Sequence, residues 1–337
     1  MNNLNSSRKE LRIELKLGDL APILNEAFRN RIKVFGEQLH LYYPSFSPYP
    51  PPIQGYKPRG FPSFSITGDA CALRCEHCYG KLLGYMTPTL TPERLREHCF
   101  KLHRQGGAGC LISGGCSKDG SVPLDNFIGV IREVKHETGL KIVVHTGLAS
   151  PETLRRLADT GVDVVSFDLI GSDLIIREIY HLSSTVKEYE RMMRLMSSIG
   201  LSFVPHINIG LYYGAILGEH TALDLALNHD PSALVFIVFT PFKDTPMEKV
   251  NPPKIMNVAE FIAYARVKAP HTPIALGCIR PLKTYRRRFD SLAVRAGING
   301  LAYPSVEVYR LLPKIRLKPV IHDTCCSLIF QDAYRVQ

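Results

Sequence analysis

Residues 64–79 read FSITGDACALRCEHCY and join a short apolar run to three cysteines, Cys71, Cys75 and Cys78. Their C-x3-C-x2-C spacing places three thiol groups on one short loop, directly after a predicted strand. A closed structural zinc or iron–sulfur site takes four protein ligands. Three ligands leave one metal position open, so the stretch predicts a metal site that can still bind another molecule.

Across residues 61–313, short apolar runs alternate with amphipathic stretches that carry helix-start signals. Thr91-Pro92 and Ser150-Pro151 each place a capping hydroxyl before a proline at the first helical position. Alternating strands and helices indicate a parallel sheet, and eight strands predict an α/β fold closed into a (β/α)8 TIM-type barrel. The predicted strands are 64–67, 109–112, 141–145, 162–167, 203–209, 234–239, 272–276 and 300–303.

Two further segments flank the predicted barrel. Residues 17–41 carry apolar side chains at helical spacing and predict a helix. The prolines between residues 44 and 58 fix φ and remove backbone donors, so they predict an extended connector that wraps the barrel. Residues 1–60 are thus an N-terminal extension, and residues 314–337, which show no clear periodicity, are a C-terminal tail that could fold back over the barrel mouth.

The composition is that of an ordinary soluble protein. Of the 337 residues 45% are apolar and 21% charged, enough for a substantial core. The first twenty residues lack the apolar run of a signal peptide, and the apolar runs elsewhere are too short to cross a bilayer. We therefore expect a cytoplasmic protein that does not enter the membrane. In such a protein nine cysteines indicate metal binding or catalysis rather than disulfides.

The formal charge of +10 predicts attraction to acidic partners. An acidic carrier protein and nucleic acid are both compatible with it, and so is a basic proteome with no such partner. The run Arg286-Arg287-Arg288 is either a solvated helix face or a docking patch for an acidic protein. No nucleic-acid motif or interleaved aromatic pattern accompanies the charge, so nucleic acid is the less favoured partner.

A second motif, Ser113-Gly114-Gly115-Cys116, follows the second predicted strand. Glycines allow a backbone to approach a ligand closely. Together with the cysteine loop, this segment resembles the radical S-adenosylmethionine (SAM) superfamily over about residues 60–305. The resemblance implies a [4Fe–4S] cluster on Cys71, Cys75 and Cys78, with SAM bound at its open iron and against the backbone of Gly114 and Gly115. His77 stands where the family usually has an aromatic residue near the adenine.

The resemblance has one departure and one competing interpretation. Cys116 occupies the position where the family usually has an acid, so the role of that acid is not carried over. A thiol there indicates a second metal ligand or a sulfur-handling residue rather than an inert core cysteine. The cysteine loop is also compatible with a zinc knuckle completed by His77 or by a distant cysteine.

Polar residues lie at the predicted ends of three successive strands, where barrel enzymes place their function. These residues are His145, Asp168, His206 and Asn208. The resemblance implies that they bind the cofactor. Each of them alone could instead be a satisfied polar group of the core.

A dispersed set of cysteines predicts an auxiliary iron–sulfur cluster. Cys278 closes the seventh predicted strand, and Cys325 and Cys326 lie in the tail. We expect Cys116, Cys278 and one of the tail pair, Cys325 in our assignment, to converge on this cluster. Arg280 is its candidate fourth ligand or a clamp for a substrate carboxylate. The alternative is three unrelated thiols.

Within the superfamily, the eight-strand barrel resembles biotin synthase and lipoyl synthase. The Gly-Gly-Cys segment, the sequence around Cys278 and the Cys325–Cys326 tail resemble archaeal proteins, some of which form a two-component lipoyl synthase. The resemblance implies reductive cleavage of SAM to a 5′-deoxyadenosyl radical, removal of hydrogen from an unactivated C–H bond and sulfur insertion into an octanoyl chain. It also implies a reductant protein such as a ferredoxin, an acidic carrier protein and a partner radical SAM protein.

Two other functions remain open. One is a radical SAM methylase, or another radical enzyme that inserts no sulfur. The other is a basic zinc-binding module for nucleic acid, for which an eight-strand barrel is a poor fit.

Overall fold

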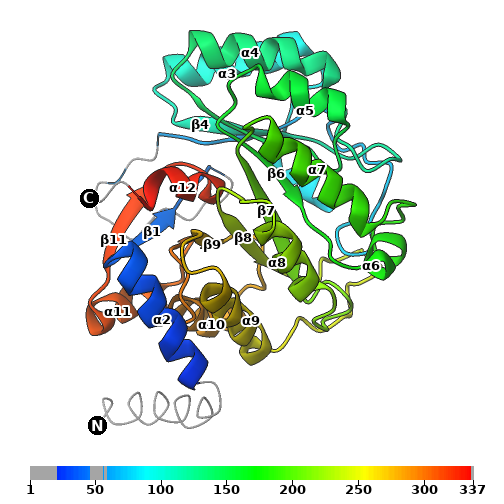
Figure 1. Cartoon of the computed structure of the whole chain (residues 1–337). Helices are drawn as coiled ribbons and strands as arrows, with labels where there is room; N and C mark the ends of the chain where they lie inside the picture. Colours follow the sequence, from blue (N-terminus) through cyan, green and yellow to red (C-terminus); the bar gives the residue numbers. More distant parts are fainter. Residues whose placement is uncertain (1–20, 46–55, 57–58, 335–337) are drawn as a thin grey trace.

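The computed structural model describes residues 21–45, 56 and 59–334. These residues form one sheet of eleven parallel strands in the order β11-β1-β10-β9-β8-β7-β6-β5-β4-β2-β3. The sheet is curled, and most of the helices cover its outer face (Figure 1). The predicted α/β class is confirmed.

All eight predicted strands are present and pair in chain order. Most residues of these strands are buried, as expected for parallel strands covered on both faces. The strands are β2 (Ser63–Ser65), β4 (Gly109–Ser113), β5 (Lys141–His145), β6 (Val164–Asp168), β7 (Phe203–Ile209), β8 (Leu234–Val238), β9 (Ile274–Leu276) and β10 (Gly300–Ala302).

The helices between these strands begin where the capping signals predict. Thr91 Oγ1 accepts a hydrogen bond of 3.3 Å from the Arg94 N–H, and Ser150 Oγ accepts one of 3.1 Å from the Thr153 N–H. The helices are α3 (Pro92–Arg104), α4 (Ile128–Glu137), α5 (Pro151–Ala158), α6 (Asp173–Glu178), α7 (Val186–Ser198), α8 (Glu219–Leu227), α9 (Ile255–Lys268), α10 (Thr284–Arg295) and α11 (Val306–Leu311), with 3-10 turns η1 (Lys81–Tyr85), η2 (Asp125–Phe127) and η3 (Leu312–Ile315).

The two edges of the sheet differ from the prediction that eight strands close into a barrel. Among the described residues, β10 pairs with β1 (Gln38–Tyr42) rather than with β2, and β1 pairs in turn with β11 (Lys318–His322). At the other edge, β2 pairs with the short strand β3 (Thr87–Pro88). The eight strands therefore do not close on each other, because strands from both ends of the chain extend one edge.

The predicted helix over residues 17–41 is shorter than expected. Helix α2 runs from Ala21 to Phe35, and residues 38–42 form β1. Gly36 has a φ of 69°, a left-handed conformation that ends helices. The buried Arg31 donates hydrogen bonds to the carbonyl oxygens of Gly36 and Gln38, which ties this turn to the start of the strand. Residues 17–20 and most of the predicted proline-rich connector lie outside the described residues.

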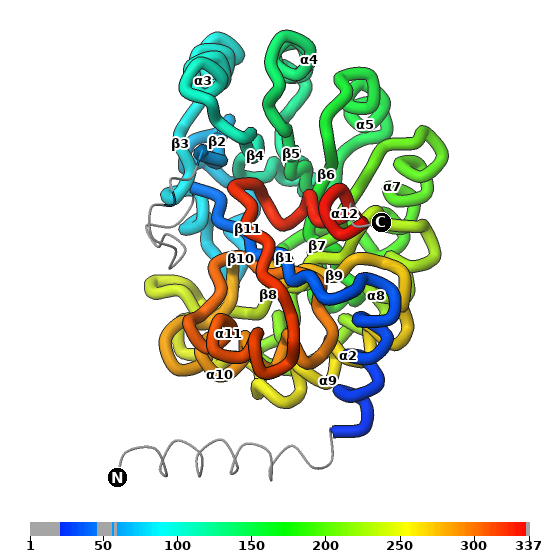
Figure 2. The backbone as a smooth tube through the Cα atoms, turned by 90° about the vertical axis from the view of Figure 1, so that its left-hand side faces the viewer, coloured from blue at the N-terminus to red at the C-terminus, as the bar shows by residue number. Residues whose placement is uncertain are grey.

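The C-terminal tail has regular structure that its sequence does not show. After β11 come the 3-10 turn η4 (Cys326–Leu328) and helix α12 (Ile329–Asp332). Turn η4 contacts β6, β8, β9 and β10, which lie on different sides of the curl. The tail therefore folds back into the hollow of the sheet (Figure 2).

Within residues 21–45, 56 and 59–334, each helix is too short or too polar to cross a membrane.

Candidate functional site

The cysteine loop follows β2 and is tightly folded. The N–H groups of Cys78 and Tyr79 both donate to the Cys75 carbonyl oxygen, at 3.2 Å and 2.8 Å. Cys75, His77 and Cys78 offer ligand atoms that all lie within 4.8 Å of one another, and they are the one such group of three in the described part of the chain. The loop therefore presents soft donors suited to a metal.

Hydrogen bonding within the loop prepares one thiol for metal binding. The Cys75 thiol donates to Cys78 and lowers the pKa of Cys78 to about 4, and the nearby His77 favours the same ionisation. Burial lowers the pKa of His77, but the Cys78 thiolate outweighs it and raises the pKa overall. Metal binding requires a thiolate, so the loop holds a ligand in the required state.

The third cysteine lies beside this group and packs against the Gly-Gly segment. A Cβ placed on Gly115 would lie 2.6 Å from the Cys71 Cβ and 2.0 Å from the Ala70 carbonyl oxygen. The Gly115 N–H donates to Thr67 Oγ1 at 2.7 Å. Gly115 therefore has a role the sequence did not reveal, because its missing side chain lets the cysteine loop close onto the end of β4.

Four polar residues predicted at strand ends are brought together inside the curl. His145 Nε2 lies 3.8 Å from Asp168 Oδ1, and the rings of His145 and His206 lie 5.3 Å apart. Asn208 lies two residues further along β7. The Tyr180 hydroxyl donates to Asp168 Oδ2 at 3.4 Å, and its ring lies 5.2 Å from that of His77. The polar cluster is thus continuous with the cysteine loop.

Burial keeps the two imidazoles of this cluster neutral. It lowers the pKa of His206 to about 3, with a contribution from His145, and it lowers the pKa of His145 against the attraction of Asp168. His206 Nδ1 and Asn208 Oδ1 are buried and have no hydrogen-bond partner within the described residues. Buried polar atoms without partners are costly, so these atoms fit a ligand that supplies the missing bonds.

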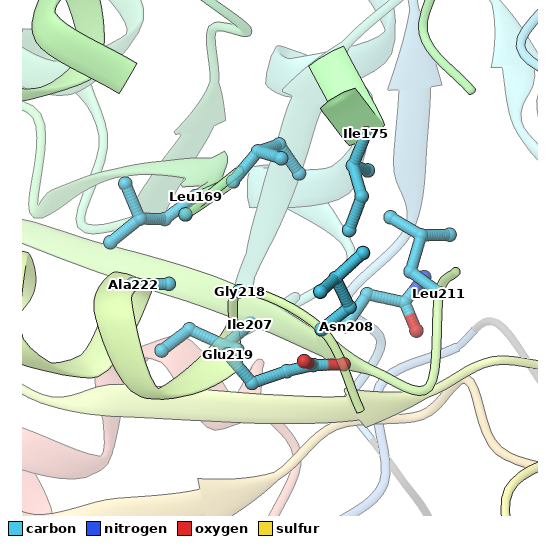
Figure 3. A pocket seen from close by; sticks show the side chains of 11 residues that line it. Leu169, Ile175, Ile207, Asn208, Leu211, Gly218, Glu219 and Ala222 are labelled. Atoms are coloured by element: carbon cyan, nitrogen blue, oxygen red, sulfur yellow. The ribbon is translucent and has the colours of Figure 1, made fainter. Parts of the chain in front are cut away.

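A small pocket beside Asn208 contains a residue that the sequence did not single out (Figure 3). Glu219, at the start of α8, is 4% exposed, and its Oε1 accepts a hydrogen bond of 2.7 Å from the Gly210 N–H. Its Oε2 is buried without a partner among the described residues. An acid placed at the first turn of a helix after a strand end is a signal that could have identified it.

A second group of thiols lies at the end of β9. Cys278 follows this strand, and Cys325 and Cys326 begin the turn that enters the curl. Burial raises the pKa of Cys278 to about 11, and the negative charge of Cys325 adds to the rise. A hydrogen bond from Cys326 lowers the pKa of Cys325 to about 7. Cys325 and Cys326 therefore share a hydrogen bond, and Cys278 lies near enough to respond to the charge of Cys325, although the three sulfurs do not all lie within 4.8 Å of one another.

Cys116 is not part of this second group, in contrast to the prediction. It follows β4, and four strands separate β4 from β9 in the sheet. Burial raises the pKa of Cys116 to about 12, and the charges that add to the rise are those of Cys71, Asp168, Cys78 and Asp119. The expected convergence of three dispersed cysteines is therefore reduced to Cys278 with the tail pair, because Cys116 belongs to the surroundings of the first loop.

Arg280 is also not placed as predicted. Its guanidinium is fully buried and donates to both carboxylate oxygens of Asp290, at 2.7 Å and 3.0 Å. It also donates to the carbonyl oxygens of Gly277 and Tyr303. These four bonds leave it unavailable as a clamp for a substrate carboxylate or as a cluster ligand.

The neighbouring basic run is divided in its contacts. Arg286 is partly buried and donates to the carbonyl oxygen of Cys278 at 3.1 Å, so its positive charge faces the second thiol group. Arg287 is paired with Glu307 at 2.6 Å, whereas Arg288 is exposed. The run is thus not a uniform solvated face.

Comparison with known proteins identifies the domain that contains the first loop. Residues 65–215, which run from the end of β2 to beyond β7, match the family profile described as the Radical SAM superfamily. The chain contains a radical SAM domain. Its cofactors are a [4Fe–4S] cluster and SAM.

Similar proteins extend the likeness beyond the radical SAM domain. The chain is 23% identical to a biotin synthase of Vibrio parahaemolyticus over 248 residues, which are 71% of this chain and 69% of that protein. It is 22% identical to a biotin synthase of Marinobacter nauticus over 288 residues, 78% of each chain. Both matched stretches are longer than residues 65–215.

Solved structures show the same fold. The crystal structure of methylornithine synthase (PylB) has a TM-score of 0.63 at 18% identity, covering 93% of this chain and 91% of that one. The structure of HydG, a maturase of the [FeFe]-hydrogenase, has a TM-score of 0.62 at 15% identity, covering 89% of this chain and 68% of that one.

The residues of the radical SAM domain fit its two cofactors. Three thiols on one loop suit an iron–sulfur cluster with an open position. The unpartnered atoms of His206 and Asn208 provide hydrogen-bonding capacity for a polar ligand inside the curl. His77 places a ring nitrogen within 4.8 Å of the Cys75 and Cys78 sulfurs, and a zinc site would share this feature.

Proposed function

We propose that this chain is a radical SAM enzyme that inserts sulfur into its substrate. Cys71, Cys75 and Cys78 would hold the [4Fe–4S] cluster, and Cys278 with Cys325 would hold a second, auxiliary iron–sulfur cluster that donates sulfur. The observation that carries the proposal is the second thiol group at the end of β9, where the turn η4 of the tail meets the strands of the curl. The likeness to biotin synthases supports it.

The chain's own residues would prepare and shield the reaction. When bound, the cluster and SAM supply the one-electron chemistry that removes a hydrogen atom from an unactivated C–H bond. His145, Asp168, His206 and Asn208 would orient SAM and the substrate by hydrogen bonds inside the curl. The tail turn η4 would exclude water from the hollow that it enters.

For the substrate we propose an octanoyl chain carried by an acidic protein, as in lipoyl synthases. The charge of +10 and the arginines of α10 near Cys278 suit an acidic partner. A reductant protein such as a ferredoxin would supply the electron, and a partner radical SAM protein could share the insertion of two sulfur atoms. The methylase or other radical enzyme without sulfur insertion is the alternative.

Anaerobic reconstitution with iron and sulfide counting tests the proposal. Two [4Fe–4S] clusters would give about eight irons per chain, and Cys278→Ala would reduce the count to about four. About four irons in the wild type would favour an enzyme without sulfur insertion. Cys75→Ala should abolish 5′-deoxyadenosine formation, and product formation by this variant would refute the assignment of the first loop. Zinc in place of iron would favour the zinc module.

A further inference from the structure

Four buried or partly buried polar side chains form a continuous chain where β1 and the C-terminal tail meet. His40 Nδ1 lies 2.9 Å from His322 Nε2. The other ring nitrogen of His322, Nδ1, lies 3.5 Å from Asp332 Oδ2. The Tyr42 hydroxyl donates to the same carboxylate oxygen at 3.0 Å. We refer to His40, Tyr42, His322 and Asp332 as the clasp.

The pairing of β1 with β11 explains why these residues meet. Tyr42 and His322 are in register on the two parallel strands, so both side chains point to the same face of the sheet. Their rings stack 4.8 Å apart with an interplanar angle of 18°. His40 lies two residues before Tyr42 and therefore on that face as well. Asp332, at the end of α12, reaches the face from the returning tail.

The hydrogen bonds of the clasp have one consistent direction. An ionised carboxylate accepts hydrogen bonds only. His322 therefore presents Nδ1–H to Asp332, and a single ring N–H joins His322 Nε2 and His40 Nδ1. Tyr42 donates to Asp332 from the other side. Each of the three contacts thus pairs a donor with an acceptor, which is what a polar network needs to specify one arrangement.

The clasp encloses the cysteines of the tail. His322 precedes Cys325 by three residues, and Asp332 follows Cys326 by six. Both flanks of the Cys325–Cys326 turn therefore end on the same strand, β1. Tyr42 is fully buried, and the charges of Cys326 and Cys325 contribute, after burial and Asp332, to raising its pKa. The clasp thus lies directly beside the thiol pair.

We propose that the clasp positions Cys325 and Cys326 against Cys278. The four clasp residues are positioning residues of the second thiol site. Strand β1, which carries His40 and Tyr42, therefore belongs to that site. The inference rests on the proposed function for the use of the thiols, but the placement itself can be measured separately. Without the clasp, the C-terminal flank of the turn would lose its anchor on β1, and the turn would open into the hollow.

Alkylation of Cys326 in reduced, metal-free, full-length protein tests the placement. Cys326 is 5% exposed, so iodoacetamide reaches it only after local opening. Asp332→Asn removes the charged acceptor and Tyr42→Phe removes one donor. Each should speed alkylation of Cys326, followed by tandem mass spectrometry, by about tenfold or more. His40→Asn keeps an amide near the Nδ1 position and should stay within about twofold of the wild type, whereas His40→Leu should behave like Tyr42→Phe.

Asp163→Asn is the matched control. Asp163 is another buried carboxylate at the N-terminal end of β6, and its partners, Lys135 at 2.6 Å and Lys141 at 3.0 Å, lie in α4 and β5 rather than in the tail. This variant should be destabilised while Cys326 alkylation keeps the wild-type rate. Unchanged alkylation in both Asp332→Asn and Tyr42→Phe would overturn the inference, and so would equal acceleration in Asp163→Asn.

Iron counting on the same variants separates the inference from the proposed function. If both hold, reconstituted Asp332→Asn should bind about four irons rather than about eight, while its first site still cleaves SAM. If the wild type itself binds about four irons but the clasp variants expose Cys326, the placement stands and the sulfur-donor role fails.

Discussion

Arg280 and Asp290 form a bidentate ion pair in which neither side chain is exposed to solvent. The pair joins the segment after β9 to α10, and Asp290 Oδ2 also accepts a hydrogen bond of 2.8 Å from the Ser305 N–H before α11. Arg280 extends the same network to the Tyr303 carbonyl oxygen after β10. This network builds the wall that presents Cys278, so a residue predicted to act on the substrate acts on the fold.

Removing one partner of this pair should destabilise the protein strongly. Asp290→Ala leaves a buried guanidinium without its counter-ion, which costs about 3–5 kcal/mol of unfolding free energy, measurable by urea denaturation. Arg194→Ala, which breaks an exposed pair with Glu190, is the control and should change stability by less than about 1 kcal/mol. A stable Arg280→Ala variant that loses only substrate affinity would restore the clamp interpretation.

Gly115→Ala should loosen the cysteine loop. Its Cβ would overlap the Ala70 carbonyl oxygen, so the loop must shift, at a cost of about 1–3 kcal/mol. We expect a lower iron content at the first site and slower 5′-deoxyadenosine formation. Gly129→Ala provides the contrast, because its Cβ would meet nothing within 4 Å in helix α4. That variant should be more stable by about 0.5–1 kcal/mol. Full iron loading of Gly115→Ala would contradict the close-packing argument.

Glu219 should make the free energy of unfolding decrease as the pH rises. Burial raises its pKa above 4.5, against the hydrogen bond from Gly210. The folded state then keeps a proton that the unfolded chain has already lost. Stability from this group is therefore present at low pH and is lost as the pH rises through the folded-state pKa. Glu219→Gln should remove this loss.

Urea unfolding at several pH values between 4.5 and 8 measures the effect. The difference in unfolding free energy between Glu219→Gln and the wild type should grow in favour of the variant as pH rises. Glu137→Gln on the exposed end of α4 serves as the control and should follow the wild-type profile. A constant difference between Glu219→Gln and the wild type would show that Glu219 stays in one protonation state.

The parts of the fold that follow from local signals were predictable. Strand β2 and the strands from β4 to β10 are largely buried apolar runs, and the helix starts at Thr91 and Ser150 depend on side chains within three residues. Cys99 in α3 and Cys110 in β4 are both fully buried. These features need no knowledge of which distant segments meet.

The predictions that the structure does not match concern features that depend on contacts between distant segments. Leu39 and Leu41 fit either a helix or a strand by spacing, and the strand is decided by pairing with β10 and β11. The burial of Arg280 depends on Asp290 and on the ends of other strands. The clasp joins residues 40 and 322, which no local pattern relates. Site residues at strand ends were found because topology brings strand ends together.

The sequence assigns the Cys116 thiol to the auxiliary cluster, whereas the structure assigns it to the surroundings of the first cysteine loop. Its carbonyl oxygen accepts a hydrogen bond of 2.8 Å from the Ala72 N–H, so its backbone supports the cysteine loop whatever its side chain is. Its thiol lies among Cys71, Cys78 and Asp168 rather than beside Cys278. Cys116→Ala should therefore keep the wild-type iron count, while Cys278→Ala loses the second site. Loss of about four irons in Cys116→Ala, with SAM cleavage intact, would show that Cys116 joins the auxiliary cluster after all.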